Sequence, residues 1–288
     1  RKRGLELYTL GGSLIKAFPF GKINNVDLSA IAGSSLPLVG GSNRSDNTLV
    51  FYFLDPHTAI LIPVGKTQVR VNEVYGFCFL PSEKGLLAAV SGTDGSIEIF
   101  TLKSRGESEI ETAPFAHFSL PSQTEGLVYD RNNKKLYLAE ENGGIWQWTL
   151  QPETIPEMLI NLKDYPLLKG DLEGLAMYYG TKDDYLLVSS QGNNRYAVFN
   201  TKAGQPTYTG VFKTHQTGDI DPCSDTDGIA IVSCPINAIF PAGMMLVQDG
   251  KNTDQQGRKT NQNFKIINWK DIAASFDPPL DSQPTCNH

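Results

Sequence analysis

The sequence has no long uninterrupted apolar run, no closely paired cysteines and few histidines. Its longest apolar stretch, Leu49 to Val64, contains Asp55 and His57, so it does not predict a transmembrane helix, and we expect no membrane partner. The four histidines and four cysteines are scattered without a CxxC pair, which gives a zinc site little support. The formal net charge of −6 argues against binding to a nucleic-acid backbone.

Common motifs of nucleophilic and nucleotide chemistry are also missing. There is no GxSxG sequence and no Walker loop, and no histidine stands in a motif that would supply the base of a catalytic triad. We therefore expect no covalent enzyme intermediate. Cys78 lies in an apolar segment and is expected to be a buried thiol. A Cys223–Cys234 disulfide is one pairing that the sequence allows, and it would require an oxidising compartment.

A short polar-Gly-apolar signal recurs along the chain at intervals of roughly fifty residues. Its copies begin at Asn25, Tyr75, Glu125, Glu173 and Asp227. Repeats of this length are typical of solenoids, propellers and other arrays. Because each residue at a fixed place in the repeat takes a fixed place in the assembly, the recurring acids and amides are expected to gather.

Each repeat reads as a small antiparallel sheet. The polar-Gly-apolar strand is followed by an apolar run with a polar end, a turn rich in Gly and Asn, and an alternating strand. Radial repetition of such sheets is the propeller solution to exposed sheet edges. The sequence predicts an all-β, six-bladed β-propeller forming a single domain over 1–288, with five full blades readable. A solenoid is the structural alternative.

The first blade is expected to be incomplete at its N-terminal end, because Gly4–Leu10 resembles the third strand of a repeat and not the first. Its earlier strands would have to come from upstream sequence or be replaced by something else. Gly40-Gly41 is interpreted as a turn signal. The only helical turn that we predict covers Lys270–Phe276, and Pro278-Pro279 ends it.

Strand direction alternates between neighbours in an antiparallel sheet, so the start of each first strand and the end of each second strand lie at the same end of a blade. These positions carry acids, amides and Arg44. Carboxylate and amide oxygens are the ligands that Ca²⁺ and Mg²⁺ prefer. Arg44 and Lys2 among the acids would suit a polyanionic substrate, since arginine binds phosphate in a bidentate manner. The simpler alternatives are solvated acids and an ordinary salt bridge for Arg44.

The same segments resemble the β-propeller phytases, which are calcium-dependent alkaline phytases. The matching segments run in order through almost the whole chain. They are Lys22–Leu28, Ser42–Ser45, Asn72–Phe77, Ser122–Gly126, Leu138–Glu141, Asp171–Gly174, Ser189–Asn193, Ser224–Gly228, Val247–Gly250 and Asn261–Ile266. The resemblance implies a six-bladed propeller that hydrolyses phytate with the help of several Ca²⁺ ions.

The resemblance also implies roles for individual residues. Catalytic roles fall on Lys2, Arg44, Tyr75 and Glu125, and substrate binding on Lys2, Arg44 and Asp94. The implied calcium ligands are Tyr75, Glu125, Glu141, Asp171, Glu173, Gln191, Asp221, Asp227, Asp249 and Asn252. The chain departs from the family at Thr93, where the family usually has a phosphate-binding lysine.

The sequence thus predicts a calcium-dependent phosphoric monoester hydrolase of the 3-phytase type, in which a metal-activated water attacks phytate. The expected substrate is a small molecule, an inositol phosphate as its calcium complex. We expect a monomer that is secreted or periplasmic. The alternative is a calcium-stabilised propeller that acts as a non-catalytic binding module. A calcium propeller that hydrolyses lactones or esters is less favoured, because no histidine base is in place.

Overall fold

The computed structural model describes residues 4–286, which are almost entirely β-structure. The chain divides into two compact units. The first contains Arg1–Leu136 and Trp148–Pro156, and the second contains Tyr137–Gln147 and Glu157–His288. Among the described residues, no helix has the length and apolarity needed to cross a membrane.

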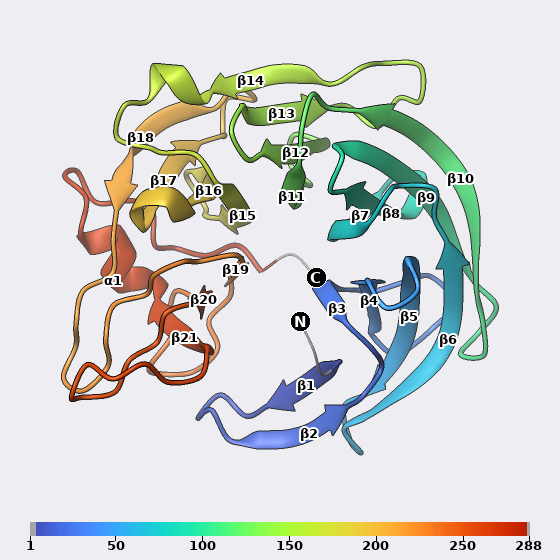
Figure 1. Ribbon diagram of the computed structural model, residues 1–288, viewed down its shortest axis with the longest axis horizontal. Helices are drawn as coiled ribbons and strands as arrows, with labels where there is room; N and C mark the ends of the chain where they lie inside the picture. The colour runs from blue at the N-terminus through green and yellow to red at the C-terminus, as the bar shows by residue number, and fades with distance from the viewer. Residues whose placement is uncertain (1–3, 287–288) are drawn as a thin grey trace. The chain divides into compact units, whose positions relative to one another are not determined.

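The first unit contains two complete four-stranded antiparallel blades, whose strands run from blue to green in Figure 1. One consists of β3 (Ile23–Ser29), β4 (Leu38–Asn43), β5 (Thr48–Asp55) and β6 (Ile60–Gln68). The other consists of β7 (Val74–Ser82), β8 (Gly85–Gly92), β9 (Ser96–Ser104) and β10 (Ile110–Ser119). Strand β11 (Thr124–Asp130), the first strand of the third blade, packs beside β7.

The second unit holds the remaining strands of the third blade and two further blades. The third blade continues with β12 (Lys135–Glu140), β13 (Gly144–Trp148) and β14 (Glu157–Asn161). The fourth contains β15 (Leu172–Tyr179), β16 (Asp184–Ser190), β17 (Arg195–Asn200) and β18 (Thr207–Phe212). The fifth contains β19 (Ile229–Val232), β20 (Met244–Asp249) and β21 (Asn263–Asn268), followed by the helix α1 (Trp269–Ala274).

The predicted six-bladed propeller is wrong in its blade number. The fold is all-β and of the propeller type, but five blades, not six, are evident in residues 4–286. Ahead of them, β1 (Leu5–Tyr8) and β2 (Leu14–Phe18) form only a two-stranded sheet. The physical reason is that this hairpin supplies two strands where the complete blades have three or four, and its Leu14 and Ile15 stay exposed. The solenoid alternative is not needed, since the repeats are propeller blades.

Gly40 and Gly41 lie inside β4 and do not form the predicted turn. A Cβ atom on Gly40 would come within 2.5 Å of the ring of Phe79 and 2.6 Å of the ring of Phe77. Those rings pack edge to face, with centroids 5.1 Å apart, in the core of the first unit. Glycine is therefore required here by close packing of aromatic side chains. The predicted helical turn near the C-terminus is confirmed as α1.

The Cys223–Cys234 pairing that the sequence allowed does not form, because Cys234 forms its disulfide with Cys286. Both bridged residues follow segments that bind the end of β15. The Ser233 Oγ accepts the Tyr179 N–H at 3.0 Å, and the Thr285 N–H donates to the Tyr179 carbonyl at 2.9 Å. These contacts bring Cys234 and Cys286 together. Cys223 is a buried free thiol, and the predicted buried thiol of Cys78 is confirmed.

Candidate metal and phosphate site

In each unit, close approach of the backbone explains why the repeat carries a glycine. A Cβ atom on Gly76 would lie only 2.0 Å from the carbonyl oxygen of Glu125, which lies in β11, the first strand of the next blade. In the second unit, a Cβ on Gly174 would lie 2.7 Å from the amide nitrogen of Ile229. The first strands of successive blades therefore approach closely at these glycines, and the acid or tyrosine before each glycine lies beside that contact.

In the first unit, Asn24 connects the starts of three first strands. Its Nδ2 group donates to Oε1 of Glu125 at 2.8 Å, to the carbonyl of Tyr75 at 3.3 Å and to Oδ1 of Asn25 at 2.7 Å. Glu125 and Tyr75 are both buried. The Oδ1 atom of Asn24 is buried and has no hydrogen-bond partner among the described residues. Asn24 is one of the amides at the first-strand starts, and the sequence alone gives no sign of its connecting role.

Arg44 immediately follows β4, at the position expected from the repeat. Its Nε donates to Oε1 of Glu73 at 2.8 Å, and its Nη2 donates to the same oxygen. The guanidinium also lies over the Tyr75 ring, with its central carbon 5.7 Å from the ring centroid. The side chains of Arg44 and Glu73 are 26% and 49% exposed. Arg44 is therefore paired with an acid and still reachable from solvent.

The other two predicted substrate-binding residues are Asp94 and Lys2, and the structure describes only Asp94. Asp94 is an exposed turn residue that accepts hydrogen bonds from the Ser96 N–H at 3.1 Å and from the Ser96 hydroxyl. The Ser96 side chain is the main cause that lowers the pKa of Asp94. The carboxylate therefore belongs to the turn between β8 and β9. Lys2 lies outside the described residues.

In the second unit, two buried acids face each other. Carboxylate oxygens of Glu141 and Glu173 lie within 4.8 Å of one another, and both residues are less than one tenth exposed. The backbone fixes this approach, since the Leu172 N–H donates to the Glu141 carbonyl at 3.0 Å. Asp171, just before β15, has a left-handed backbone with φ of 61°, and its carbonyl accepts the Gln191 N–H at 2.9 Å. The structure thus brings these four predicted ligands to one end of their blades.

Asp227 joins the same end of the second unit through its neighbours. Its Oδ1 accepts Nε2 of Gln191 at 2.6 Å, and its backbone N–H donates to Oε1 of Gln248 at 2.9 Å. Asn252, in contrast, uses its side-chain amide inside its own loop. Its Nδ2 donates to Oγ1 of Thr260 at 2.6 Å and to the Asn261 carbonyl at 3.0 Å.

Asp221 and Asp249 are bound by a residue that sequence reasoning missed. Lys265, on β21, donates from Nζ to Oδ1 of Asp221 and, at 2.7 Å, to Oδ2 of Asp249. Burial opposes the charge of this ammonium, but the hydrogen bonds to the two aspartates raise the pKa of Lys265 overall. Burial likewise opposes the charge of Asp221, and its hydrogen bonds with Lys265 and Thr253 lower the pKa of that carboxyl. The ammonium of Lys265 and the carboxylate of Asp221 are therefore both charged at neutral pH.

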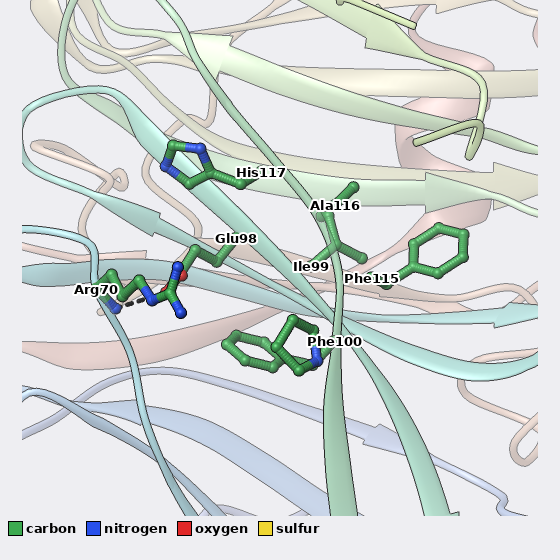
Figure 2. A pocket seen from close by; sticks show the side chains of 8 residues that line it. Arg70, Glu98, Ile99, Phe100, Phe115, Ala116 and His117 are labelled. Atoms are coloured by element: carbon green, nitrogen blue, oxygen red, sulfur yellow. Dashed lines mark hydrogen bonds between the residues drawn. The ribbon is translucent and has the colours of Figure 1, made fainter. Parts of the chain in front are cut away.

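A separate pocket with a volume of about 220 Å³ lies on the second blade, between Arg70 and the strands β9 and β10 (Figure 2). A bulge between Pro114 and Ala116 interrupts the pairing of β9 with β10 there. The buried Glu98 accepts the backbone N–H of Arg70 at 2.6 Å through Oε2, and His117 and Phe115 complete the rim. None of the predicted site residues lines this pocket, so the predicted site does not depend on it.

Comparison with known proteins identifies the family. A family model described as Phytase matches residues 1–287. The 3-phytase of Bacillus subtilis (strain 168) is 35% identical over 286 residues, which cover 95% of this chain and 74% of that protein. The chain belongs to the phytase family. It is therefore an enzyme of the hydrolase class, as the sequence predicted.

Two solved structures share the fold with this phytase-family chain at low sequence identity. A crystal structure of a nidogen/laminin complex matches with a TM-score of 0.54 and 12% identity, covering 87% of this chain and 82% of that chain. A crystal structure of BBS1N in complex with ARL6DN, soaked with mercury, matches with a TM-score of 0.52 and 15% identity, covering 88% and 68%. At these identities the comparison shows the fold alone.

Proposed function

We propose that this phytase-family enzyme is a calcium-dependent phosphoric monoester hydrolase that releases phosphate from phytate. Family membership supports the reaction class. The observation that carries the calcium dependence is the buried pair Glu141 and Glu173. Two buried carboxylates at this distance repel each other when both are ionised, and a bound cation relieves that repulsion.

The donor groups fit calcium better than a softer metal. The acids and amides at these strand ends offer oxygen ligands, and Ca²⁺ takes six to eight of them in flexible geometry. The buried Oδ1 of Asn24, without a hydrogen-bond partner among the described residues, is an additional oxygen of this kind. The proposed ligands are Tyr75 and Glu125 in the first unit and Glu141, Asp171, Glu173, Gln191, Asp227 and Asn252 in the second.

When bound, calcium would neutralise phosphate charge and lower the pKa of a bound water. The protein's own contribution is to hold the oxygen donors and to bind the substrate anion. Arg44 is the proposed phosphate contact, and its planar guanidinium suits a bidentate interaction with phosphate oxygens. Substrate phosphate would take the place of the Glu73 carboxylate beside Arg44. Tyr75 supports this arrangement, because its ring lies under the guanidinium.

One observation favours the second candidate, a calcium-stabilised binding module without catalysis. Arg44 already has an acidic partner in Glu73, which satisfies its charge without any substrate. A purely structural Arg44 would leave the enzyme without one of its proposed phosphate contacts, and Thr93 does not supply another cation. Phosphate release distinguishes the two candidates, because a binding module releases none.

We also propose that the enzyme acts as a monomer outside the reducing cytoplasm. The Cys234–Cys286 disulfide supports this location, since such bonds persist in oxidising compartments.

The direct test measures inorganic phosphate released from phytate by the purified enzyme, first in millimolar calcium and then in excess chelator. We expect release in calcium, loss of release in chelator and recovery when calcium is restored. Binding of phytate without release of phosphate would favour the binding module. Undiminished release in chelator would contradict the calcium dependence while leaving the hydrolase intact.

A further inference from the structure

The ammonium of Lys265 lies inside a set of four oxygen atoms in the second unit. Besides Asp221 Oδ1 and Asp249 Oδ2, Nζ donates to the carbonyl of Asp221 at 2.8 Å and to the carbonyl of Pro222 at 3.3 Å. The Lys265 side chain is only 9% exposed, and Asp249 is fully buried. Carboxylate and carbonyl oxygens are the ligands that proteins use to bind Ca²⁺. Here they surround an ammonium.

The other carboxylate oxygens of Asp221 and Asp249 also accept hydrogen bonds. Oδ2 of Asp221 accepts the N–H and the hydroxyl of Thr253, both at 2.9 Å. Oδ1 of Asp249 accepts the Ser224 N–H at 2.9 Å and its hydroxyl at 3.4 Å. Every carboxylate oxygen of the two aspartates is thus hydrogen-bonded. An ion placed on these oxygens would have to displace these donors and would face a buried positive charge.

We infer that the ammonium of Lys265 permanently occupies this cage, the four oxygen atoms of Asp221, Pro222 and Asp249. Asp221 and Asp249 therefore bind Lys265 and do not bind calcium. The inference departs from the ligand set that the family resemblance implies. It rests on the proposed function only in assuming that calcium binds at the other acids of the chain.

The cage makes Lys265 a positioning residue for Asp227. Lys265 ties β21 to Asp221 and Pro222, at the start of the loop that carries Asp227. Asp249 connects the same lysine to Ser224, whose carbonyl also accepts the Gly250 N–H at 2.8 Å. The loop from Asp221 to Asp227 is therefore held in place before any metal binds. A built-in ammonium does this at any calcium concentration.

The first arm of the test counts calcium ions. Wild type and Asp221→Asn are dialysed to equilibrium against calcium, and the metal bound per chain is measured. We expect equal numbers for the two proteins, because Asp221 is not a ligand. Loss of one calcium in Asp221→Asn would overturn the inference. This arm does not depend on whether any lysine variant folds.

The second arm measures melting temperature in excess chelator, where calcium cannot contribute. Lys265→Met leaves two buried carboxylates without their cation, so we expect a drop on the order of 10 °C. The matched control is Lys251→Met, whose lysine pairs with Asp225 at 2.8 Å but is 64% exposed. The control should shift the melting temperature by no more than about 1–2 °C. Wild-type melting of Lys265→Met in chelator would overturn the inference.

The two proposals fail in different ways. If wild type binds no calcium, the proposed function falls, while melting in chelator still decides the role of Lys265. If calcium binds and phosphate is released but Asp221→Asn loses an ion, the function stands and the role of Lys265 as the permanent occupant of the cage falls.

Discussion

Arg44 donates hydrogen bonds from two nitrogens to a single oxygen of Glu73. An ion pair this exposed contributes little to stability, typically about 0–1 kcal/mol. The pair therefore orients the guanidinium but binds it only weakly. A phosphate, which offers more oxygens than one carboxylate, can replace Glu73 as its partner. This relationship makes Arg44 the residue whose role most needs a kinetic test.

We expect Arg44→Lys to lower kcat/KM for phytate by roughly one to two decades, because loss of a charge-assisted contact costs about 1.5–3 kcal/mol. Melting in calcium should change little. The matched control is Arg105→Lys, since Arg105 forms a similar exposed pair with Glu111. It should leave kcat/KM unchanged. A large fall in melting temperature with unchanged kcat/KM for Arg44→Ala would show a structural role instead.

Asp27 should make stability depend on pH in the acid range. Burial raises the pKa of Asp27 to about 6, although it accepts the backbone N–H groups of Phe79 and Leu28. Between its ordinary value near 4 and about 6, the folded state binds more protons than the unfolded state. The free energy of unfolding should therefore fall as pH rises through this window.

The measurement for Asp27 is urea unfolding of wild type and Asp27→Asn at pH 4 and pH 7. Relative to wild type, the variant should gain about 1–2 kcal/mol on going from pH 4 to pH 7, because asparagine does not titrate. A stability difference that is the same at both pH values would mean that Asp27 does not carry a raised pKa in the folded protein.

The disulfide prediction concerns thiol counts and stability together. Denatured but unreduced protein should show two reactive thiols, Cys78 and Cys223, and all four after reduction. Because the bridge closes a loop across 52 residues, the double variant Cys234→Ser/Cys286→Ser should lose about 2–4 kcal/mol of unfolding free energy. Four reactive thiols before reduction would show that the bridge is not formed.

Because Glu141 and Glu173 form a close acid pair, the effect of Glu141→Gln on the melting temperature should depend on calcium. Glu141→Gln removes a charge next to Glu173, so the variant should melt at the same temperature as wild type or a few degrees higher in chelator. In millimolar calcium it should melt below wild type, because ligands that bind only the folded state raise its stability. Parallel curves in both conditions would argue against a cation at this pair.

Much of the fold was predictable because the repeat has a local cause. The glycines at 76 and 174 allow successive first strands to approach, and these glycines recur visibly in the sequence at the repeat interval. Trp148 and Trp269 are buried, as large apolar side chains in a blade core are expected to be. Trp146 is only partly buried and donates to Glu140 at 2.9 Å, because its strand presents that side chain toward an acid.

The parts that could not be predicted depend on contacts between distant residues. Lys265 meets Asp221 across 44 residues, and no local pattern marks a lysine between apolar neighbours as buried. The partner of Cys234 depends on how the C-terminal segment binds Tyr179. Gly40-Gly41 looked like a turn because only the folded core reveals the rings of Phe77 and Phe79 beside it.

The central claim is that calcium held by the buried acids drives phosphate release from phytate. The most direct test measures initial rates of phosphate release against free calcium for wild type and Glu173→Gln. We predict that wild type requires calcium, and that Glu173→Gln needs at least tenfold more calcium for half its maximal rate, as loss of about 1.4 kcal/mol of binding energy requires. The same half-saturating calcium in both proteins, or a rate that is independent of calcium, would contradict the account.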